Sequence, residues 1–332
     1  MPIDLKTPDP RDAFLTAICL TLRETNRTAG LHVDATALSL DRLRDCSKPQ
    51  IAQIVLDSNL GRICLGDLFA IDLDSSPSDP ATQDQSWSGD ALILRGCLRN
   101  FRGLCASTAS GTTVILGDVG DDFARSQRGG VLIVDGSVGR RALADKRDGL
   151  ALIGADAGER LGCPLPGKLQ GIQGGDSIVL GNLGERACQR MRRGSLCVAG
   201  NVGNHLADHW IAGTILAMGQ VGPHFGTQMR RGSLILPSTR PAQPGATLSA
   251  YRPLELSFLP ILWRYLRGLI RHASSCPWLD QELQSRCIQF ASKIPTSRHV
   301  LRSIGDLECD GQGEVLVLQE NPSRIDAYSR NP

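Results

Sequence analysis

The amino-acid sequence predicts a mainly β protein: a parallel β-helix of about seven 19-residue coils with small α+β additions at its N- and C-terminal ends. The first observation is that 28 of the 36 glycines fall between Gly89 and Gly232. The second is their spacing, because repeats in register begin at positions 89, 111, 130, 149, 175, 194, 213 and 232. A fixed period indicates a solenoid, and each repeat opens with a short run of β-forming residues.

Five of the repeats also carry a Gly-x-aliphatic-Gly tetrad, which predicts a corner, whereas the units at Gly89 and Gly149 depart from this pattern. Glycine tolerates positive φ, a small polar residue caps the neighbouring backbone, and the aliphatic residue can point inward. The corner glycines are Gly117, Gly120, Gly136, Gly139, Gly181, Gly184, Gly200, Gly203, Gly219 and Gly222. Later in each repeat, a common offset predicts further inward side chains at Phe123, Ala142, Ala187, Leu206 and Phe225.

The period excludes two other interpretations. A helical solenoid is excluded because its repeats have about 33 residues or more, whereas the repeat here has 19. A nucleotide-binding glycine loop occurs once, between one strand and one helix, whereas this pattern recurs every 19 residues. The unit at Gly149 carries seven extra residues near Gly162–Gly171. This insertion predicts a loop, which is either a passive bulge or part of a binding side.

The flanks differ from the array in composition and divide the chain into residues 1–88, 89–236 and 237–332. Both flanks are placed to cap the open ends of the β-helix, which otherwise expose unpaired backbone. The first flank predicts a strand at Ile18–Arg23, a short helix opened by Ser39, a strand pair within Arg62–Leu73 and a polar link at Ser75–Ser88. The last predicts helices over Leu254–Ile270 and Trp278–Ile294 that pack on the β-helix, then a hairpin of Val300–Ile304 and Glu314–Gln319.

Composition narrows the class of protein. A formal net charge of +2 argues against nucleic acid as the main partner. No apolar run approaches the roughly 20 residues that span a membrane, and Met1–Pro10 does not read as a secretory leader, so we expect a cytoplasmic protein. Eleven cysteines without a CxxC pair indicate reduced thiols instead of a disulfide framework or a zinc knuckle.

Two histidines share one position in consecutive repeats. His205 and His224 lie 11 residues after Gly194 and Gly213, so a regular coil places one above the other. Metal binding would need a third ligand, for which Asp208 is the only nearby carboxylate. The alternatives are histidines hydrogen-bonded to the coil, or an interface, and we assign no metal ligand.

Arginines form a similar ladder 17 and 18 positions after the repeat starts. Its members are Arg128, Arg192, Arg193, Arg230 and Arg231, with Arg147 at the same offset. Stacked like charges face either water or acidic partners. No GxSxG or HExxH motif accompanies them, and we assign no catalytic residue.

Several motifs together resemble a known family. The array ends in Met229-Arg230-Arg231-Gly232, Leu65–Phe69 precedes it, Tyr251-Arg252-Pro253 follows it, and Gly305-Asp306-Leu307 and Gly311–Glu314 lie near the end. This combination resembles the C subunit of formylmethanofuran dehydrogenase and of the bacterial formyltransferase/hydrolase complex. Both belong to the GXGXG β-helix family, which includes the C-terminal domain of glutamate synthase. The resemblance implies a right-handed parallel β-helix.

The resemblance also implies a function, namely that of a non-catalytic scaffold subunit. In the bacterial complex, a formyl group passes from formyl-tetrahydromethanopterin to a methanofuran analogue and is hydrolysed to formate. The implied partners are formyltransferase, hydrolase-like and molybdopterin-protein-like chains. This chain would bind no cofactor alone, and zinc, or a tungsten or molybdenum pterin in the dehydrogenase, would sit on other subunits.

The ladder would then neutralise carboxylates of neighbouring subunits or of a methanofuran-type polyglutamate tail. The alternatives are the C subunit of a tungsten or molybdenum formylmethanofuran dehydrogenase, a glutamate-synthase-like structural β-helix in another assembly, and a self-sufficient β-helix enzyme.

Overall fold

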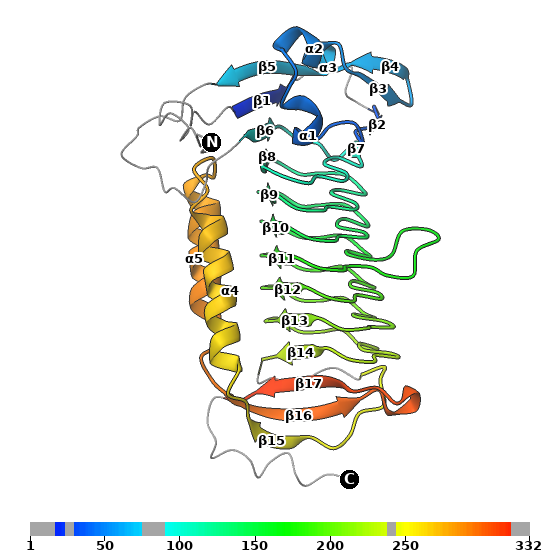
Figure 1. The fold of residues 1–332 in the computed structure, drawn as a ribbon, viewed down its shortest axis with the longest axis vertical. Helices are drawn as coiled ribbons and strands as arrows, with labels where there is room; N and C mark the ends of the chain where they lie inside the picture. The colour runs from blue at the N-terminus through cyan, green and yellow to red at the C-terminus, as the bar shows by residue number, and fades with distance from the viewer. Residues whose placement is uncertain (1–16, 24–29, 75–89, 238–243, 320–332) are drawn as a thin grey trace, which may run out of the picture.

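The computed structural model describes residues 17–23, 30–74, 90–237 and 244–319 (Figure 1). The leader prediction at Met1–Pro10, the link Ser75–Ser88 and the repeat start Gly89 lie outside these ranges. The protein is mainly β, with a large parallel-rich sheet and few helices. Within the described residues, no helix combines the length and the apolar character needed to cross a membrane.

The glycine-rich segment forms a ladder of parallel strands, one per layer (Figure 1). From the repeat at 111 onward, each strand pairs with the next repeat's strand in the predicted register; Leu196, for example, lies opposite Ile215. The first repeat differs from the prediction by one residue, because Ala91 lies opposite Thr112, 21 residues on, where the starts at 89 and 111 predict 22. The 19-residue spacing is therefore the spacing between stacked neighbours. The strands are β6 (Ala91–Arg95), β8 (Thr112–Leu116), β9 (Val131–Val134), β10 (Leu150–Ile153), β11 (Asp176–Val179), β12 (Ser195–Val198), β13 (Thr214–Ala217) and β14 (Ser233–Leu236).

A second line of contacts joins the layers at the aliphatic residue of each corner. Isolated parallel bridges link these residues in the order Leu98, Val119, Val138, Ala157, Leu183, Val202 and Val221. The corner glycines stand beside them because there is no room for a side chain. At each of the ten predicted positions a Cβ atom would come closer than 3.0 Å to an atom of the preceding layer.

A third segment of each layer has an unusual backbone, in which every second residue is left-handed. Asp122, Ala124 and Ser126 have φ of 58°, 52° and 57°. Their N–H groups bond alternately to the two neighbouring layers: Asp122 donates to the Arg140 carbonyl and Ala124 to that of Leu104, both at 2.8 Å. A left-handed L residue costs roughly 1–2 kcal/mol, so these interlayer hydrogen bonds must offset a real strain.

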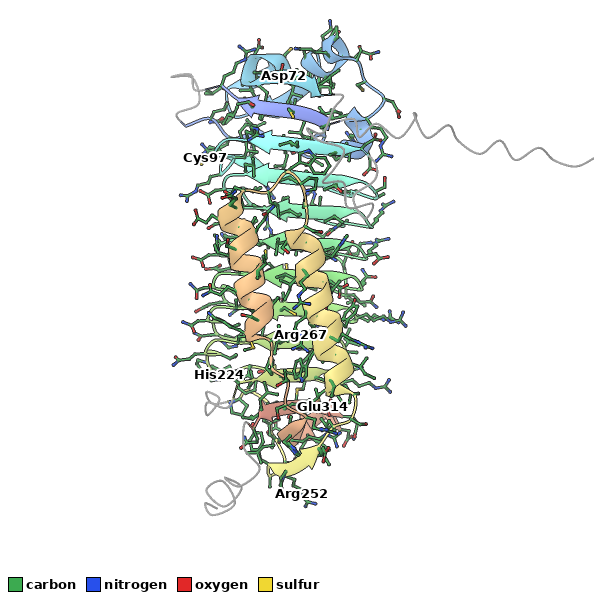
Figure 2. The ribbon with its side chains drawn as sticks, turned by 90° about the vertical axis from the view of Figure 1, so that its left-hand side faces the viewer. Asp72, Cys97, His224, Arg252, Arg267 and Glu314 are labelled. Atoms are coloured by element: carbon green, nitrogen blue, oxygen red, sulfur yellow. The ribbon has the colours of Figure 1, made fainter. Side chains whose placement is uncertain are left out.

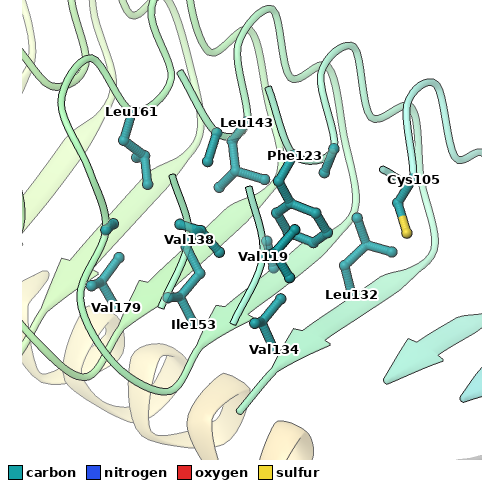
Figure 3. Close-up of a cluster of buried hydrophobic side chains, with 14 of the residues drawn as sticks. Cys105, Val119, Phe123, Leu132, Val134, Val138, Leu143, Ile153, Leu161 and Val179 are labelled. Atoms are coloured by element: carbon teal, nitrogen blue, oxygen red, sulfur yellow. The ribbon is translucent and has the colours of Figure 1, made fainter. Parts of the chain in front are cut away.

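The interior of the stack is mainly apolar, and Figure 3 shows one part of this core. The inward positions predicted from the repeat offset are confirmed, since each of these side chains is at most 1% exposed: Phe123, Ala142, Ala187, Leu206 and Phe225. Leu132, Val134 and Ile153 from the strands pack against the corner valines, and together they form one continuous core.

Two helices cover the outer face of the strands (Figure 2). They are α4 (Leu259–Ser274) and α5 (Gln281–Lys293), and the prediction that they pack on the stack is confirmed. Trp263 and Phe290 lie among outward strand residues such as Ile178 and Leu216. The first helix begins later than predicted because Arg252–Glu255 forms the edge strand β15, and Pro260 then occupies the first turn of α4.

Both ends of the ladder are covered by flanking strands. At one end β1 (Ala17–Leu22) pairs in parallel with β6 and antiparallel with β5 (Phe69–Asp74). At the other, β17 (Gly313–Leu318) pairs in parallel with β14 and forms the predicted hairpin with β16 (His299–Gly305), which pairs with β15. A turn of 3-10 helix at Leu307–Cys309 lies between the hairpin strands.

The N-terminal flank corrects one prediction. The region Arg62–Leu73 does not fold back as a strand pair: β4 (Gly61–Cys64) and β5 belong to different sheets, separated by the helical turn α3 (Leu65–Leu68). A Cβ atom on Gly66 in this turn would come within 3.0 Å of Ala52, so the turn packs closely on that residue. The remaining elements are α1 (Leu40–Leu43), opened by Ser39 as predicted, α2 (Lys48–Ala52), β2 (Val33–Asp34), β3 (Val55–Ser58) and β7 (Phe101–Arg102).

Candidate functional site

The predicted arginine ladder forms an exposed surface that we call the arginine face. It consists of Arg128, Arg192, Arg193, Arg230 and Arg231, all exposed. The backbone holds them in place, because the N–H groups of Arg192 and Arg230 each donate to a carbonyl of the preceding turn at 2.7 Å. Among the residues that the structure describes, none of the five side chains makes an ion pair or a hydrogen bond.

Several other cations in the N-terminal layers, by contrast, are neutralised. Asp122, whose side chain is 3% exposed, accepts hydrogen bonds from Arg102 at 2.5 Å and from Arg141 at 2.7 Å. Burial raises the pKa of Asp122, but the two guanidinium groups outweigh burial and hold that pKa below its ordinary value. Arg147, at the ladder offset, lies 3.5 Å from Asp145. Of the five arginines of the arginine face, which are unpaired within the described residues, four lie in the C-terminal layers, and Arg128 lies nearer the N-terminal end of the stack.

The histidine pair lies beside these layers, stacked as the repeat offset predicts. The rings of His205 and His224 have centroids 5.1 Å apart and planes inclined by 20°. A hollow of about 410 Å³ adjoins them, lined by Arg186, His205, Asp208, His224, Thr227 and Gly245. Asp208 bonds to the Nδ1 atom of His209 at 2.7 Å. Across the described ranges, no three His, Cys, Asp or Glu side chains are grouped to hold a metal ion.

The insertion lies next to the arginine face. Its chain leaves and re-enters the layers at Gly162 and Ile172, where the Ile172 N–H donates to the Gly162 carbonyl at 3.1 Å. Leu169 at its tip is 74% exposed. A second hollow of about 290 Å³ is lined by Leu169, Gln170, Arg190, His209, Ile211, Gln228, Arg230 and Cys309. The loop and the ladder, separate features of the sequence, thus share one surface.

Sequence reasoning missed two cations at these hollows, Arg186 and Arg190. Arg186 and Arg190 lie 11 and 15 residues after Gly175. In the next layer, His205 and His209 lie at the same distances after Gly194. Counting every polar residue by its offset would have found them. With them, the surface can bind carboxylates, because guanidinium groups grip a carboxylate through two parallel hydrogen bonds.

The buried thiols are unsuited to nucleophilic chemistry. Burial raises the pKa of Cys105, Cys188 and Cys197 to about 12, so each stays protonated near neutral pH. The arrangement that these side chains support is therefore binding of anionic groups at the surface.

A comparison with solved structures gives an informative match. No family model matches the chain, and no match was found among curated proteins. A solved structure, the formyltransferase/hydrolase complex (FhcABCD) from Methylorubrum extorquens with bound methylofuran, contains a chain of similar fold. The TM-score is 0.68 and the identity 26%, over 91% of this chain and 99% of that chain. The protein is thus related in structure to a chain of a formyltransferase/hydrolase complex.

Proposed function

We propose that this chain is a non-catalytic scaffold subunit of a one-carbon enzyme complex of the formyltransferase/hydrolase kind. The supporting observation is the structural likeness, which extends over nearly the whole of both chains. The scaffold would be a right-handed parallel β-helix of about seven coils, in which every layer repeats the same outward positions. Such a body is rigid and presents side chains in straight lines.

The chemistry would be performed by other chains. They would transfer a formyl group from formyl-tetrahydromethanopterin to a methanofuran-type carrier and hydrolyse it to formate, with zinc on the hydrolase chain. The arginine face and the pair His205 and His224 would bind carboxylates of those subunits or of the carrier's acidic tail. The guanidinium groups of the arginine face are exposed and, among the residues that the structure describes, unpaired, which supports this role. An exposed arginine breaks no existing ion pair when it binds a carboxylate.

A charge reversal tests the arginine face. We expect the quadruple variant of Arg192, Arg193, Arg230 and Arg231 to Glu to stay folded by circular dichroism but to copurify poorly with the partner chains. Each exposed ion pair contributes only about 0–1 kcal/mol, so four are changed together. Copurification at wild-type yield and salt resistance would make the ladder a solvated face.

A matched control carries the same charge change elsewhere. It replaces Lys48, Arg62, Arg99 and Arg140 with Glu, all of them exposed residues in surface ion pairs. We expect this variant to retain partner binding, because its charges lie outside the arginine face. Equal losses in both variants would mean that net charge, not this surface, controls assembly.

Metal analysis of the purified complex tests the reaction class. Zinc without tungsten or molybdenum supports the formyltransferase/hydrolase kind. Stoichiometric tungsten or molybdenum would instead assign the chain to a formylmethanofuran dehydrogenase.

A further inference from the structure

The outer side of helix α4 exposes apolar side chains. Its inner side packs on the strands through Leu259, Trp263, Leu266, Ile270 and Ala273. Away from this inner side, Phe258 just before the helix is 42% exposed and Ile261 64%, and Tyr265, at the flank of the helix, is 50% exposed. Spacings of three and four residues place these three on one helical face. They form a stripe of exposed apolar side chains along the helix.

The same face is cationic. Helix α4 contains no acidic residue, and Arg264 and Arg271 are exposed. Neither makes an ion pair or a side-chain hydrogen bond within the described part of the chain. Arg267 differs, because it donates to the carbonyls of Ile294 and Pro295 at 3.3 and 3.2 Å and so fastens α4 to the end of α5.

Two features of this face favour close contact with another chain. The Tyr265 hydroxyl donates to Asp176 Oδ2 at 2.7 Å, which fixes the ring against strand β11. Gly268 follows on the same face, and a Cβ atom there would meet nothing within 4 Å. Glycine in a helix interior costs about 1 kcal/mol relative to alanine, and its open surface lets another chain approach the backbone.

The α4 face adjoins the arginine face. Asp176, which holds Tyr265, lies opposite Ser195 in the ladder, and Ser195 is two residues from Arg193. An apolar stripe flanked by Arg264 and Arg271 thus continues into a row of unpaired arginines. A purely anionic tail would need the cations but not the exposed Phe258, Ile261 and Tyr265.

We propose that the α4 face, defined by Phe258, Ile261, Arg264, Tyr265, Gly268 and Arg271, docks an amphipathic acidic segment of another protein subunit. This inference rests on the proposed scaffold function and adds the chemistry of the partner. The apolar side chains anchor the segment, and its carboxylates pair with the arginines, so the two surfaces are complementary in both respects.

A protein segment fits this surface better than an anionic membrane does. Helix α5 lies beside α4 on the same side of the stack (Figure 2), and its first turn exposes Asp280 and Glu282. A flat anionic bilayer would meet these carboxylates together with the arginines of α4. A narrow partner segment can follow α4 alone.

The test measures binding of the purified full-length chain to the partner chains of a formyltransferase/hydrolase complex from the same source. The double variant Phe258→Ser, Ile261→Ser is expected to lower affinity about 10-fold or more at low and high salt, as truncated apolar anchors do. Arg264→Glu with Arg271→Glu should lose binding mainly at low salt. Ile288→Ser on α5 is the matched control, because Ile288 is 60% exposed, and it should stay within about 2-fold of wild type.

The outcomes separate the two proposals. If the wild-type chain does not bind these partners, both the scaffold function and this inference fail. If it binds and the arginine-face variant is weakened, but the α4 double variant is folded and binds like wild type, only the inference fails. The inference is also overturned if the α4 variant loses binding to phosphatidylcholine and phosphatidylglycerol vesicles instead of to the partner chains.

Discussion

Replacing Lys146 with Met tests the energetics of the stack, because this lysine is a fully buried cation. It is 0% exposed, and its Nζ atom donates to the carbonyls of Asp148 at 3.2 Å and of Gly149. The same offset in later layers carries Met191, Trp210 and Met229, all buried. One layer earlier the position holds Gln127, a buried polar residue, but in the later layers it holds large, mainly apolar side chains, and Met is a residue that the protein itself uses there.

The magnitude follows from the pKa. Burial lowers the pKa of Lys146 from 10.5 to about 8, against the attraction of Asp176 and Asp148. At about 1.4 kcal/mol per pH unit, keeping the buried amine protonated costs about 3 kcal/mol below pH 8. Removing two hydrogen bonds gives back about 1 kcal/mol each. We therefore expect Lys146→Met to be about 1 kcal/mol more stable than wild type at pH 7.

The sign of the pH dependence is specific. Between pH 8 and 10.5 the unfolded chain holds the Lys146 proton and the folded chain does not, so wild-type stability gains as pH rises. The variant lacks this gain. The difference in stability between the two proteins should therefore shift by about 3 kcal/mol in favour of wild type across this window. Buried thiols act oppositely above pH 9, because their pKa values are raised by folding, but they are common to both proteins and cancel in the difference.

The assay is urea unfolding at several pH values from 7 to 10.5, followed by circular dichroism and tryptophan fluorescence. Lys48→Met provides the control, since the Lys48 side chain is 57% exposed and pairs only with Asp72 at the surface. Its unfolding curve should track wild type at every pH. A constant difference between Lys146→Met and wild type from pH 7 to 10.5 would refute the assignment of a buried, destabilised cation.

Three further outcomes are expected. Gly200→Ala should destabilise the stack by about 1–3 kcal/mol in urea unfolding, because the added Cβ would press on the backbone of the preceding layer. Gly268→Ala, on an open helix surface, should stabilise the protein by about 1 kcal/mol, and the reverse order of stabilities would contradict a close-packed corner at Gly200. Deleting residues 1–88 should give insoluble protein, because removal of β1 would expose the edge of β6. A soluble, monomeric 89–332 fragment would disprove that residues 1–88 cap this edge. Since the pKa of Asp122 is lowered on folding, Asp122→Asn should weaken stability at pH 7 and lose less stability than wild type as pH falls below 4 in acid titrations.

The sequence by itself determined the layered repeat. Glycine at a close-packed corner and an apolar residue at a fixed offset are local requirements, and they recur whenever the chain returns to the same place. Hence the strand register, the inward Phe123 and Phe225, and the stacking of His205 on His224 all follow from counting residues. The arginine ladder is equally visible, because its members share one offset.

Only the tertiary structure decided what depends on contacts between distant segments. The left-handed residues at Asp122, Arg141 and His205 carry no sequence signal, since interlayer hydrogen bonds override a local preference that favours glycine. The division of Arg62–Leu73 between two sheets likewise depends on pairing with β1 and β3. The meeting of the insertion with Cys309, and of α4 with β11, depends on where remote side chains come to pack. Local rules fix the period of a repeat, but the surfaces between its additions arise only when the whole chain has folded.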